Sequence, residues 1–436
     1  MGYTVTSSRD VLGNRSLCFF FICAFGLVTL LQQIIYGKNY IKSGLQFSWQ
    51  SGDETENWTG TFNFTDDGAL KPASDRDSSL FLKNIVENVS DVEDVTTGVR
   101  QEKKLYFEFY DGPYEYNSTT CKELRQEIMD VKVLSMVKNS ELFDKWKSLQ
   151  ACKWQMNKAE ANAFKASLSR CCNAPAFMFT TQRNTPFGTK LRYEVDTSGV
   201  LHISPGIFKM FPKDMPYSRS QFKKCAVIGN GGILKNSKCG KAIDSADFVF
   251  RCNLPPISEE YAADVGYKTN IVTINPSIIT ERFQKLEKWR KPFYEVLQTY
   301  ENSSVVLPAF YNTHNTDVSF RVKYVLDDFD SPQSVFYFHP QYLLNVQRFW
   351  MMQGVVAKRL STGLMLVTAA MELCEEVHLY GFWGFPMDPN GIFMTHHYYD
   401  NVKPRPGFHA MPHEIFNFLH LHSRGILQVH TRACSR

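Results

Sequence analysis

Two histidines near the C-terminus carry the side chain best suited to move a proton near neutral pH. His397 opens the stretch His-Tyr-Tyr-Asp, and His409 opens the stretch His-Ala-Met-Pro-His-Glu. An imidazole with a pKa of about 6.5 can accept the proton of an attacking hydroxyl group. A single histidine is more often structural than catalytic, because neutral imidazole packs well once it is hydrogen-bonded. Residue type alone therefore makes the pair a candidate for acid–base chemistry.

Metal binding is the alternative use of these side chains. His409 and His413 are four residues apart, but Pro412 interferes with the helix that would aim both rings at one ion. The sequence also lacks the His-Glu-x-x-His spacing of zinc hydrolases. The pair Asp328 and Asp330 has the spacing by which some glycosyltransferases hold a metal, but it lies in an acidic run typical of a solvated helix end. We expect no metal site.

The tripeptide Ser361-Thr362-Gly363 precedes an apolar periodic run. A serine or threonine in this position is an N-cap signature, so a helix is expected to begin here. The unpaired amides of its first turn and the helix dipole favour an anion. A cap without any ligand is the commoner situation, and the tripeptide alone favours it.

A buried strand runs into a glycine-rich turn at Gly229–Gly232. Turns of this kind bring backbone amides close to a nucleotide. Gly229 and Gly231 match the first two glycines of the dinucleotide-binding pattern, but Leu234 occupies the third position, and no P-loop lysine follows. A Rossmann oxidoreductase is therefore disfavoured.

Asn230 and Asn253 each end a predicted strand. The carboxamide has both donors and acceptors, which suit a pyrimidine edge or sugar hydroxyls. Asparagine is also an ordinary turn residue, so both interpretations stay open from the sequence.

The elements that must position these residues alternate regularly after Gln221. Short apolar runs predict strands at Cys225–Gly229, Phe248–Cys252, Ile271–Ile274, Ser304–Leu307, Ser334–Phe338 and Glu376–Leu379. Helical patterns lie around Ile278–Lys291, Asp317–Phe329, Gln341–Met352 and Thr362–Cys374, and an earlier one over Glu123–Leu149. This order predicts an α/β fold with a mostly parallel sheet covered on both faces, in which ligands bind beyond the carboxyl ends of the strands.

The N-terminal part has a different character. Residues 17–36 form an apolar run of about the length that crosses a bilayer, and no small-x-small cleavage site follows it. We predict a cytosolic tail over 1–16, a transmembrane signal-anchor over 17–36, a polar lumenal stem over 37–104 and a catalytic domain over 105–436. Glycosylation sequons that follow the span favour this type II orientation; they begin at Asn57, Asn63, Asn88, Asn117 and Asn302.

Charge and cysteine content bear on the partners and the compartment, and the cysteines agree with an oxidising lumen. The net charge of +4 is small for 436 residues and gives no reason to expect nucleic acid as a partner. The basic cluster of Lys285, Lys288, Arg290 and Lys291 is more typical of a solvated helix face than of a glycolipid contact. Two of the 11 cysteines lie within the span, and the remaining odd number leaves one thiol unpaired, for which we expect Cys252.

Four segments carry a resemblance to a known family. Cys225–Ser277 resembles the large sialyl motif of the animal sialyltransferases, and Leu360–Phe385 resembles their small motif. His397–Asp400 looks like the third motif, and His409–Glu414 fits the very short motif. All four occur in the family's order, and the sequence is most similar to the ganglioside type of the alpha-2,8-sialyltransferase subfamily. The resemblance implies a Rossmann-like sheet of the variant glycosyltransferase A type.

The resemblance also implies roles for the residues. His409 would take the acceptor proton and His397 would hydrogen-bond the departing phosphate of CMP, supported by His396. Trp383 could be a core residue or a stacking wall, and the resemblance places it at the donor. The implied donor-binding set is Asn230, Asn253, Ser361, Thr362, Gly363, Trp383, Gly384, Phe385, His396 and His397.

The implied reaction is the inverting transfer of N-acetylneuraminic acid (Neu5Ac) from CMP-Neu5Ac to the 8-hydroxyl of a terminal sialic acid. No metal cofactor is expected, because the single phosphate of CMP-Neu5Ac already bears the sugar. The subtype implies ganglioside acceptors and products of the GT3, GD1c, GT1a and GQ1b types, in the Golgi membrane. Glycoprotein acceptors, an alpha-2,3 or alpha-2,6 linkage, and a membrane-anchored protein that binds sialylated glycans without turnover stay as alternatives. Homo-oligomerisation is left open.

Disulfides are implied in the same way. Cys225 would pair with Cys374, and Cys239 with Cys434. The sequence does not fix the partners of Cys121, Cys152, Cys171 and Cys172, for which a bond from Cys152 to either Cys171 or Cys172 is a guess.

Overall fold

The computed structural model describes residues 117–196, 198–217, 222–403 and 409–434. The predicted tail, membrane span and stem lie outside these residues, as do the sequons at Asn57, Asn63 and Asn88. Within the described part, no helix is both long and apolar enough to cross a membrane. Asn117 and Asn302 are described, and both are exposed.

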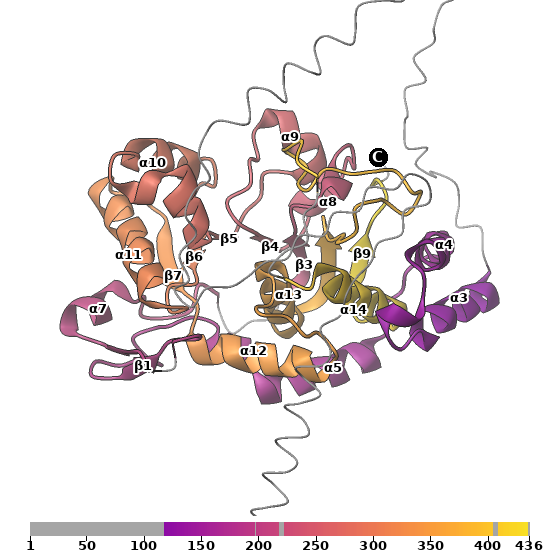
Figure 1. Ribbon diagram of the computed structural model, residues 1–436, viewed down its shortest axis with the longest axis horizontal. Helices are drawn as coiled ribbons and strands as arrows, with labels where there is room; N and C mark the ends of the chain where they lie inside the picture. Colours follow the sequence, from indigo (N-terminus) through magenta and orange to yellow (C-terminus); the bar gives the residue numbers. More distant parts are fainter. Residues whose placement is uncertain (1–116, 197, 218–221, 404–408, 435–436) are drawn as a thin grey trace, which may run out of the picture. The chain divides into compact units, whose positions relative to one another are not determined.

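A parallel sheet forms the centre of the described chain (Figure 1). Its strand order is β7-β6-β5-β4-β3-β8-β9, and every neighbouring pair is parallel. The strands are β3 Phe222–Ile228, β4 Phe248–Arg251, β5 Ile271–Thr273, β6 Ser304–Leu307, β7 Ser334–Tyr337, β8 Cys374–Tyr380 and β9 Gln428–His430. All six predicted strands are present. Three further strands were not predicted: β9, which is three residues long, and the small antiparallel pair β1 Lys190–Arg192 and β2 Val200–His202.

Side chains of the strands alternate between two hydrophobic cores, one on each face of the sheet. In β3, Cys225 and Val227 belong to one core, whereas Ala226 and Ile228 belong to the other. The first core includes residues of α3 Ser118–Asp130, α4 Asn139–Leu149, α5 Lys158–Cys171, α12 Pro340–Met352, α13 Thr362–Leu373 and α14 Met411–Ser423. The second includes residues of α8 Gly240–Asp244, α9 Glu259–Val265, α10 Arg290–Gln298 and α11 Thr313–Asp328. Burial on both faces explains why these strands read as continuous apolar runs.

Two of the predicted helices are interrupted. The pattern over Glu123–Leu149 divides into α3 and α4, which flank the short 3-10 turn Leu134–Met136. The expected helix over Ile278–Lys291 is wrong as a single element: a π turn at Ile278–Arg282 is followed by three residues with positive φ at 284–286, and α10 begins at Arg290. Pro292 lacks the amide that an uninterrupted helix would need, but it fits the first turn of a new one. The remaining short helices are α6 Ala174–Phe177, α7 Pro205–Met210, and 3-10 turns at Gly232–Leu234 and Gln284–Leu286.

The disulfides confirm the two implied pairs and correct the guess. Cys225 bonds to Cys374 and Cys239 bonds to Cys434, while Cys252 is buried and unpaired. The guessed bond from Cys152 to Cys171 or Cys172 is wrong. Cys152 pairs with Cys121, because the chain after α4 returns beside α3, and Cys171 pairs with its neighbour Cys172.

Candidate active site

Loops that follow the central strands meet at one edge of the sheet, because parallel strands all end there. Asn230 follows β3, Asn253 follows β4, Asn275 follows β5 and Tyr311 lies beyond β6. The sheet order places them along this edge in the reverse of that sequence, from β6 to β3. Asn230 and Asn253, the two predicted site residues of this set, therefore lie where the fold class expects a ligand.

The glycines of the turn are required by close contacts with other parts of the protein. A Cβ atom on Gly229 would lie 2.6 Å from the carbonyl oxygen of Gly381, and one on Gly231 would lie 2.7 Å from the same oxygen. A Cβ on Gly232 would lie 2.3 Å from the carbonyl oxygen of Thr395. The turn is thus packed against the loop after β8 and against the segment that carries His397.

Asn230 ties the ends of two strands together. Its Nδ2 donates to the carbonyl of Cys252 at 2.8 Å, and its own carbonyl accepts from the amide of Tyr398 at 3.0 Å. Its Oδ1 is buried and has no hydrogen-bond partner among the described residues. An unsatisfied buried acceptor is uncommon, and an N–H or O–H group of a bound donor would satisfy it.

Asn253 adopts the left-handed conformation, with a φ of 61°. Its amide donates to Oγ1 of Thr273 at 2.9 Å, and that hydroxyl lies 3.4 Å from Oδ1 of Asn253. Asparagine tolerates this backbone better than most residues do. The structure therefore confirms that Asn253 is a turn residue, which the sequence left open, and its side chain contacts Thr273.

His397 is held beside the glycine turn by a bridge with Gly231. Its Nδ1 lies 2.6 Å from Oδ2 of Asp400, and its amide donates to Oδ1 of the same carboxylate at 3.1 Å. The ring of Tyr399 stacks on the imidazole with a centroid distance of 5.0 Å, and the ring of His396 packs edge-on at 4.1 Å. Because the carboxylate accepts at Nδ1, the proton resides there and Nε2 is the reactive nitrogen.

Asp400 remains ionised in this arrangement. Burial acts to raise the pKa of its carboxyl group, but hydrogen bonds from His397 and Val402 outweigh burial and lower it. A negative carboxylate stabilises a positively charged imidazole. His397 is therefore equipped to hold a proton beside an anion.

Ser361 caps α13, as its position in the tripeptide predicts. Its Oγ accepts from the amide of Leu364 at 3.0 Å. Thr362 donates from Oγ1 to Oδ1 of Asn275 at 3.3 Å, which joins the helix start to the loop after β5. A Cβ on Gly363 would lie 2.6 Å from the ring of Phe382, so only glycine fits there.

Glu414, the last residue of the fourth motif, is buried and bonded twice to Ser361. Its Oε1 accepts from the amide of Ser361 at 2.9 Å, and its Oε2 accepts from the Ser361 hydroxyl. Burial raises the pKa of Glu414, and the bonds from Ser361 oppose that effect. The carboxylate therefore satisfies the first amide of the cap and fixes the start of α14 against the start of α13.

His409 lies beside this junction. Its Nδ1 donates to the carbonyl of Arg359 at 2.9 Å, two residues before the cap. A carbonyl can only accept, so the neutral ring carries its proton on Nδ1 and presents the lone pair of Nε2 as the base. The charge of His409 also acts on Glu414 and favours its ionised form. Both predicted histidines therefore reach the sheet edge, His397 beside the turn after β3 and His409 beside the capped helix.

The Gly-Phe-Trp-Gly-Phe segment contributes to the core. Trp383 is buried, donates from Nε1 to the carbonyl of Met387 at 2.6 Å, and packs on Phe143 with a centroid distance of 5.3 Å. Phe385 packs on Phe143 at 5.0 Å and on Trp383 at 5.2 Å, and a Cβ on Gly384 would lie 2.8 Å from the backbone of Met411. Of the two interpretations of Trp383, a core residue or a stacking wall, the structure shows its side chain in the core. Its backbone amide lies 3.7 Å from the Cβ position of Gly231, so its main chain borders the turn.

The candidate metal residues take other roles. Asp328 forms an ion pair with Arg290 on the surface, and His413 is exposed. No group of three or more histidine, cysteine, aspartate or glutamate side chains in the described ranges is arranged to hold a metal ion.

Sequence reasoning missed four residues that shape this site: Asp400, Glu414, Asn275 and Arg359. The first two close motifs that begin with the candidate histidines, so their acidic character was an available signal. Asn275 ends a strand in the same way as Asn230 and Asn253. Nothing in the sequence singled out Arg359.

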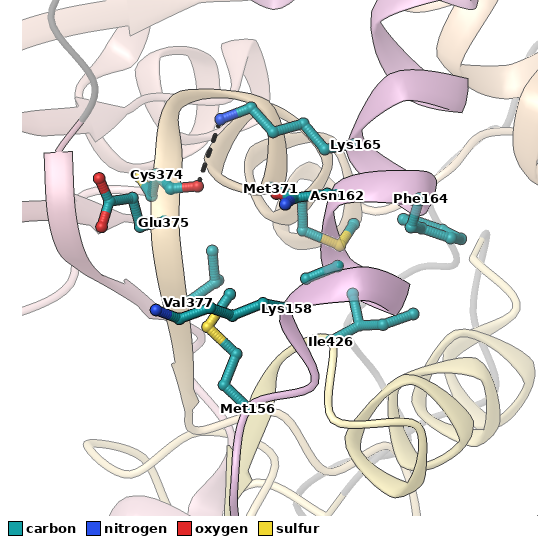
Figure 2. A pocket seen from close by; sticks show the side chains of 11 residues that line it. Met156, Lys158, Asn162, Phe164, Lys165, Met371, Cys374, Glu375, Val377 and Ile426 are labelled. Carbon is teal, nitrogen blue, oxygen red and sulfur yellow. Dashed lines mark hydrogen bonds between the residues drawn. The ribbon is translucent and has the colours of Figure 1, made fainter.

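A cavity of about 230 Å³ lies elsewhere, between α5 and the start of β8 (Figure 2). Lys165 extends across it and donates to the carbonyl of Cys374 at 3.5 Å, while Met156, Met371 and Val377 line its apolar part. Because β8 begins at Cys374, the cavity is at the amino-terminal edge of the sheet, opposite the edge that carries the histidines. It is not part of the candidate active site.

Comparisons with known proteins show the family of this chain. Residues 173–426 match the family model described as glycosyltransferase family 29 (sialyltransferase). The proteins named alpha-2,8-sialyltransferase 8E in Pan troglodytes and Homo sapiens are each 66% identical over 430 residues, which cover 99% of this chain and 98% of theirs. A Xenopus laevis protein named alpha-N-acetylneuraminide alpha-2,8-sialyltransferase is 48% identical over 284 residues, or 65% of this chain and 79% of that protein.

Proposed function

This chain is an enzyme of glycosyltransferase family 29, the sialyltransferases, and from that premise we propose that it transfers Neu5Ac from CMP-Neu5Ac to the 8-hydroxyl of a terminal sialic acid. The alpha-2,8 linkage is supported by the names of relatives that are 66% identical over nearly the full chain. The observation that carries the mechanism is the bond from Nδ1 of His409 to the carbonyl of Arg359. It leaves Nε2 as the proton acceptor.

His409 is the general base of this proposal. As the acceptor hydroxyl attacks the anomeric carbon of Neu5Ac, its proton passes to Nε2 of His409. The attack and the departure of CMP occur on opposite sides of that carbon, so the anomeric configuration is inverted. Glu414 stabilises the positive charge that His409 gains, because it is the nearby carboxylate that already responds to this histidine.

His397 acts on the other side of the reaction. Its Nε2 hydrogen-bonds the phosphate of CMP as negative charge develops there, and Asp400 stabilises the charged imidazole. The amides at the start of α13 supply a second source of positive potential for the phosphate. Asn230 and Asn253 would hold the nucleoside at the ends of β3 and β4, with the main chain of 383–385 at the border.

The acceptor and the compartment extend the proposal further. Ganglioside acceptors, products of the GT3, GD1c, GT1a and GQ1b types, and a variant glycosyltransferase A fold follow from the resemblance of the motifs. Residues 17–36 would anchor the enzyme in the Golgi membrane with the catalytic domain in the lumen, where glycans would be attached to exposed sequons such as Asn117 and Asn302.

One incubation tests reaction, acceptor and linkage together. The enzyme is mixed with CMP-Neu5Ac and a panel of gangliosides and sialoglycoproteins, and the products are analysed by mass spectrometry and linkage-specific hydrolysis. We expect CMP release with an alpha-2,8-linked product on the gangliosides. A product linked alpha-2,3 or alpha-2,6, or glycan binding without CMP release, would contradict the proposal. Activity should also survive EDTA, and its loss in EDTA with recovery in manganese would contradict the metal-independent mechanism.

A further inference from the structure

Arg359, whose carbonyl positions His409, also has a charged side chain that could bind a ligand. The main-chain carbonyl of Arg359 accepts from His409, so the guanidinium group of the same residue starts from a point next to the base. The Arg359 side chain is 16% exposed, which leaves a small face open to solvent. A permanent positive charge near a catalytic base opposes protonation of the imidazole unless an anion is also present.

Two residues fix the plane of this guanidinium. Its central carbon lies 4.2 Å above the ring of Tyr311, a cation–π arrangement. Its Nη2 lies 3.4 Å from both carboxylate oxygens of Glu194. Backbone bonds from Glu194 to Phe310 at 3.0 Å and from Val195 to Tyr311 at 3.2 Å hold this pair of residues to the loop after β6.

The pairing leaves hydrogen-bonding capacity unused. One nitrogen makes both contacts to Glu194, at the long end of the hydrogen-bond range. Nε of Arg359 is buried and has no hydrogen-bond partner within the described residues. Burial raises the pKa of Glu194, and Arg359 only partly opposes this, so Glu194 is a weak counter-ion for the guanidinium. An arginine has five N–H donors in a planar fork that fits a carboxylate, and most of these donors are not accounted for by Glu194.

Position along the sheet separates this charge from the donor residues. The nucleoside residues follow β3 and β4, whereas Tyr311 follows β6, which lies two places from β4 in the sheet order. The start of the capped helix lies between the two, because Thr362 bonds to Asn275 after β5. The guanidinium, which packs on Tyr311, is therefore toward β6 and away from the donor residues, and this leaves it available to an attacking sugar.

We infer that Arg359 binds the carboxylate of the acceptor's terminal sialic acid and makes the site selective for sialic acid over neutral sugars. This inference rests on the proposed function, because it assumes a sialic acid acceptor. Galactose and other neutral acceptor sugars carry no carboxylate, so they leave the guanidinium unpaired in a partly buried site. Tyr311 and Glu194 are positioning residues that hold the guanidinium plane. Neither is assigned a contact with the reacting atoms.

A matched pair of acceptors tests the assignment. One is a ganglioside that ends in sialic acid, and the other is the same ganglioside with that carboxylate converted to the neutral carboxamide of equal shape. Wild-type enzyme should use the acid about 10- to 100-fold better in kcat/KM, the range expected for charge-assisted hydrogen bonds. In Arg359→Gln the two acceptors should become nearly equal. Arg359→Lys should give an intermediate ratio, because it keeps the charge without the fork.

Controls separate this role from a structural one. Arg321→Gln removes an arginine of α11 that pairs with Asp317 of the same helix and with Glu287, which precedes α10, and it should leave the acid-to-amide ratio unchanged. CMP-dependent thermal stabilisation reports whether each variant is folded. If Arg359→Gln slows both acceptors equally, the residue only supports His409 and the inference is wrong.

The remaining outcomes are also decisive. Equal use of acid and carboxamide by the wild-type enzyme overturns the inference while leaving sialyl transfer intact. The donor also carries a carboxylate, so a rise in the KM for CMP-Neu5Ac with an unchanged acceptor ratio in Arg359→Gln would assign the arginine to the donor instead. Failure of the wild-type enzyme to extend either acceptor overturns the proposed function itself, and the inference with it.

Discussion

The carboxylate of Glu414 accepts hydrogen bonds from both the amide and the hydroxyl of Ser361, although the two residues are 53 positions apart in the sequence. The two residues belong to different motifs, and their contact fixes the first turn of α14 to the first turn of α13. His409 lies five residues before Glu414 and bonds to Arg359, two residues before Ser361. The contact between Glu414 and Ser361 therefore fixes the two segments that position His409, the candidate base.

Replacement of this carboxylate should damage stability and rate together. In Glu414→Gln, the amide group turns a donor toward at least one of the two donors of Ser361, so one buried hydrogen bond is lost. We expect a loss of about 1–3 kcal/mol in the free energy of unfolding, together with a lower kcat. Thermal denaturation and CMP release would measure both. The exposed Glu260 offers a matched control, and Glu260→Gln should change neither.

The base itself should affect chemistry without affecting the fold. His409→Gln retains a group that can bond near the Arg359 carbonyl but cannot accept a proton at neutral pH. Transfer should fall about 10²- to 10⁴-fold in kcat, while CMP-Neu5Ac still binds. His413→Gln, four residues along and exposed, should keep full activity. Retention of wild-type kcat by His409→Gln would remove His409 from the mechanism.

Asp400 should act through His397. Asp400→Asn keeps the size of the side chain but removes the charge that fixes the proton on Nδ1 of His397. We expect kcat to fall about tenfold or more, which corresponds to one charge-assisted hydrogen bond. The KM for the acceptor should change little, because no acceptor contact is altered. If Asp400→Asn changes only the KM for the acceptor, the pair of His397 and Asp400 serves acceptor binding instead.

Stability should decrease as the pH falls below about 6.5, because buried histidines must take up protons on unfolding. Burial lowers the pKa of His422 to about 3, and its Nδ1 accepts from the amide of Val429 at 3.0 Å. Between the unfolded and folded pKa values, the unfolded chain binds a proton that the folded chain does not. Protonation of His422 in the unfolded chain should therefore lower the free energy of unfolding by about 2 kcal/mol between pH 6.5 and pH 5.

Urea unfolding at pH 5, 6 and 7 would measure this dependence. In His422→Asn the carboxamide oxygen can still accept from Val429, but it does not titrate. The stability of the variant should depend less steeply on pH, by about 1 kcal/mol per pH unit on average in this range. An equal slope in both proteins would assign the effect to other groups, such as His378, whose pKa burial also lowers.

The disulfide from Cys239 to Cys434 fastens the chain after β9 beside the start of α8. In the double variant Cys239→Ser/Cys434→Ser, the free energy of unfolding should fall by about 3–5 kcal/mol, because the disulfide closes a long loop in the unfolded chain. Cys252→Ala removes the unpaired thiol and should cost less. Peptide mapping without reduction should recover Cys121 joined to Cys152, and a bond from Cys152 to Cys171 would contradict the structure.

The sequence was sufficient for the order of the strands along the chain and for the identity of the chemistry-bearing groups. Strands buried on both faces are short apolar runs bounded by turns, so β3 to β8 could be located from local composition alone. The cap at Ser361 is also local, since it needs only a hydroxyl before an apolar run. The interruption at residues 284–286 was missed because consecutive positive φ values have no side-chain signature there.

Tertiary structure decided which groups act on one another. The contacts of Glu414 with Ser361, of His409 with Arg359 and of Asn275 with Thr362 each join segments that are at least 50 residues apart. The glycine turn and Trp383 illustrate the same point, because the protein groups packed against them come from distant segments and cannot be read from their own sequence. Local spacing encodes the conformation of a segment, whereas the pairing of distant segments depends on how the parallel strands bring their carboxyl ends to a common edge.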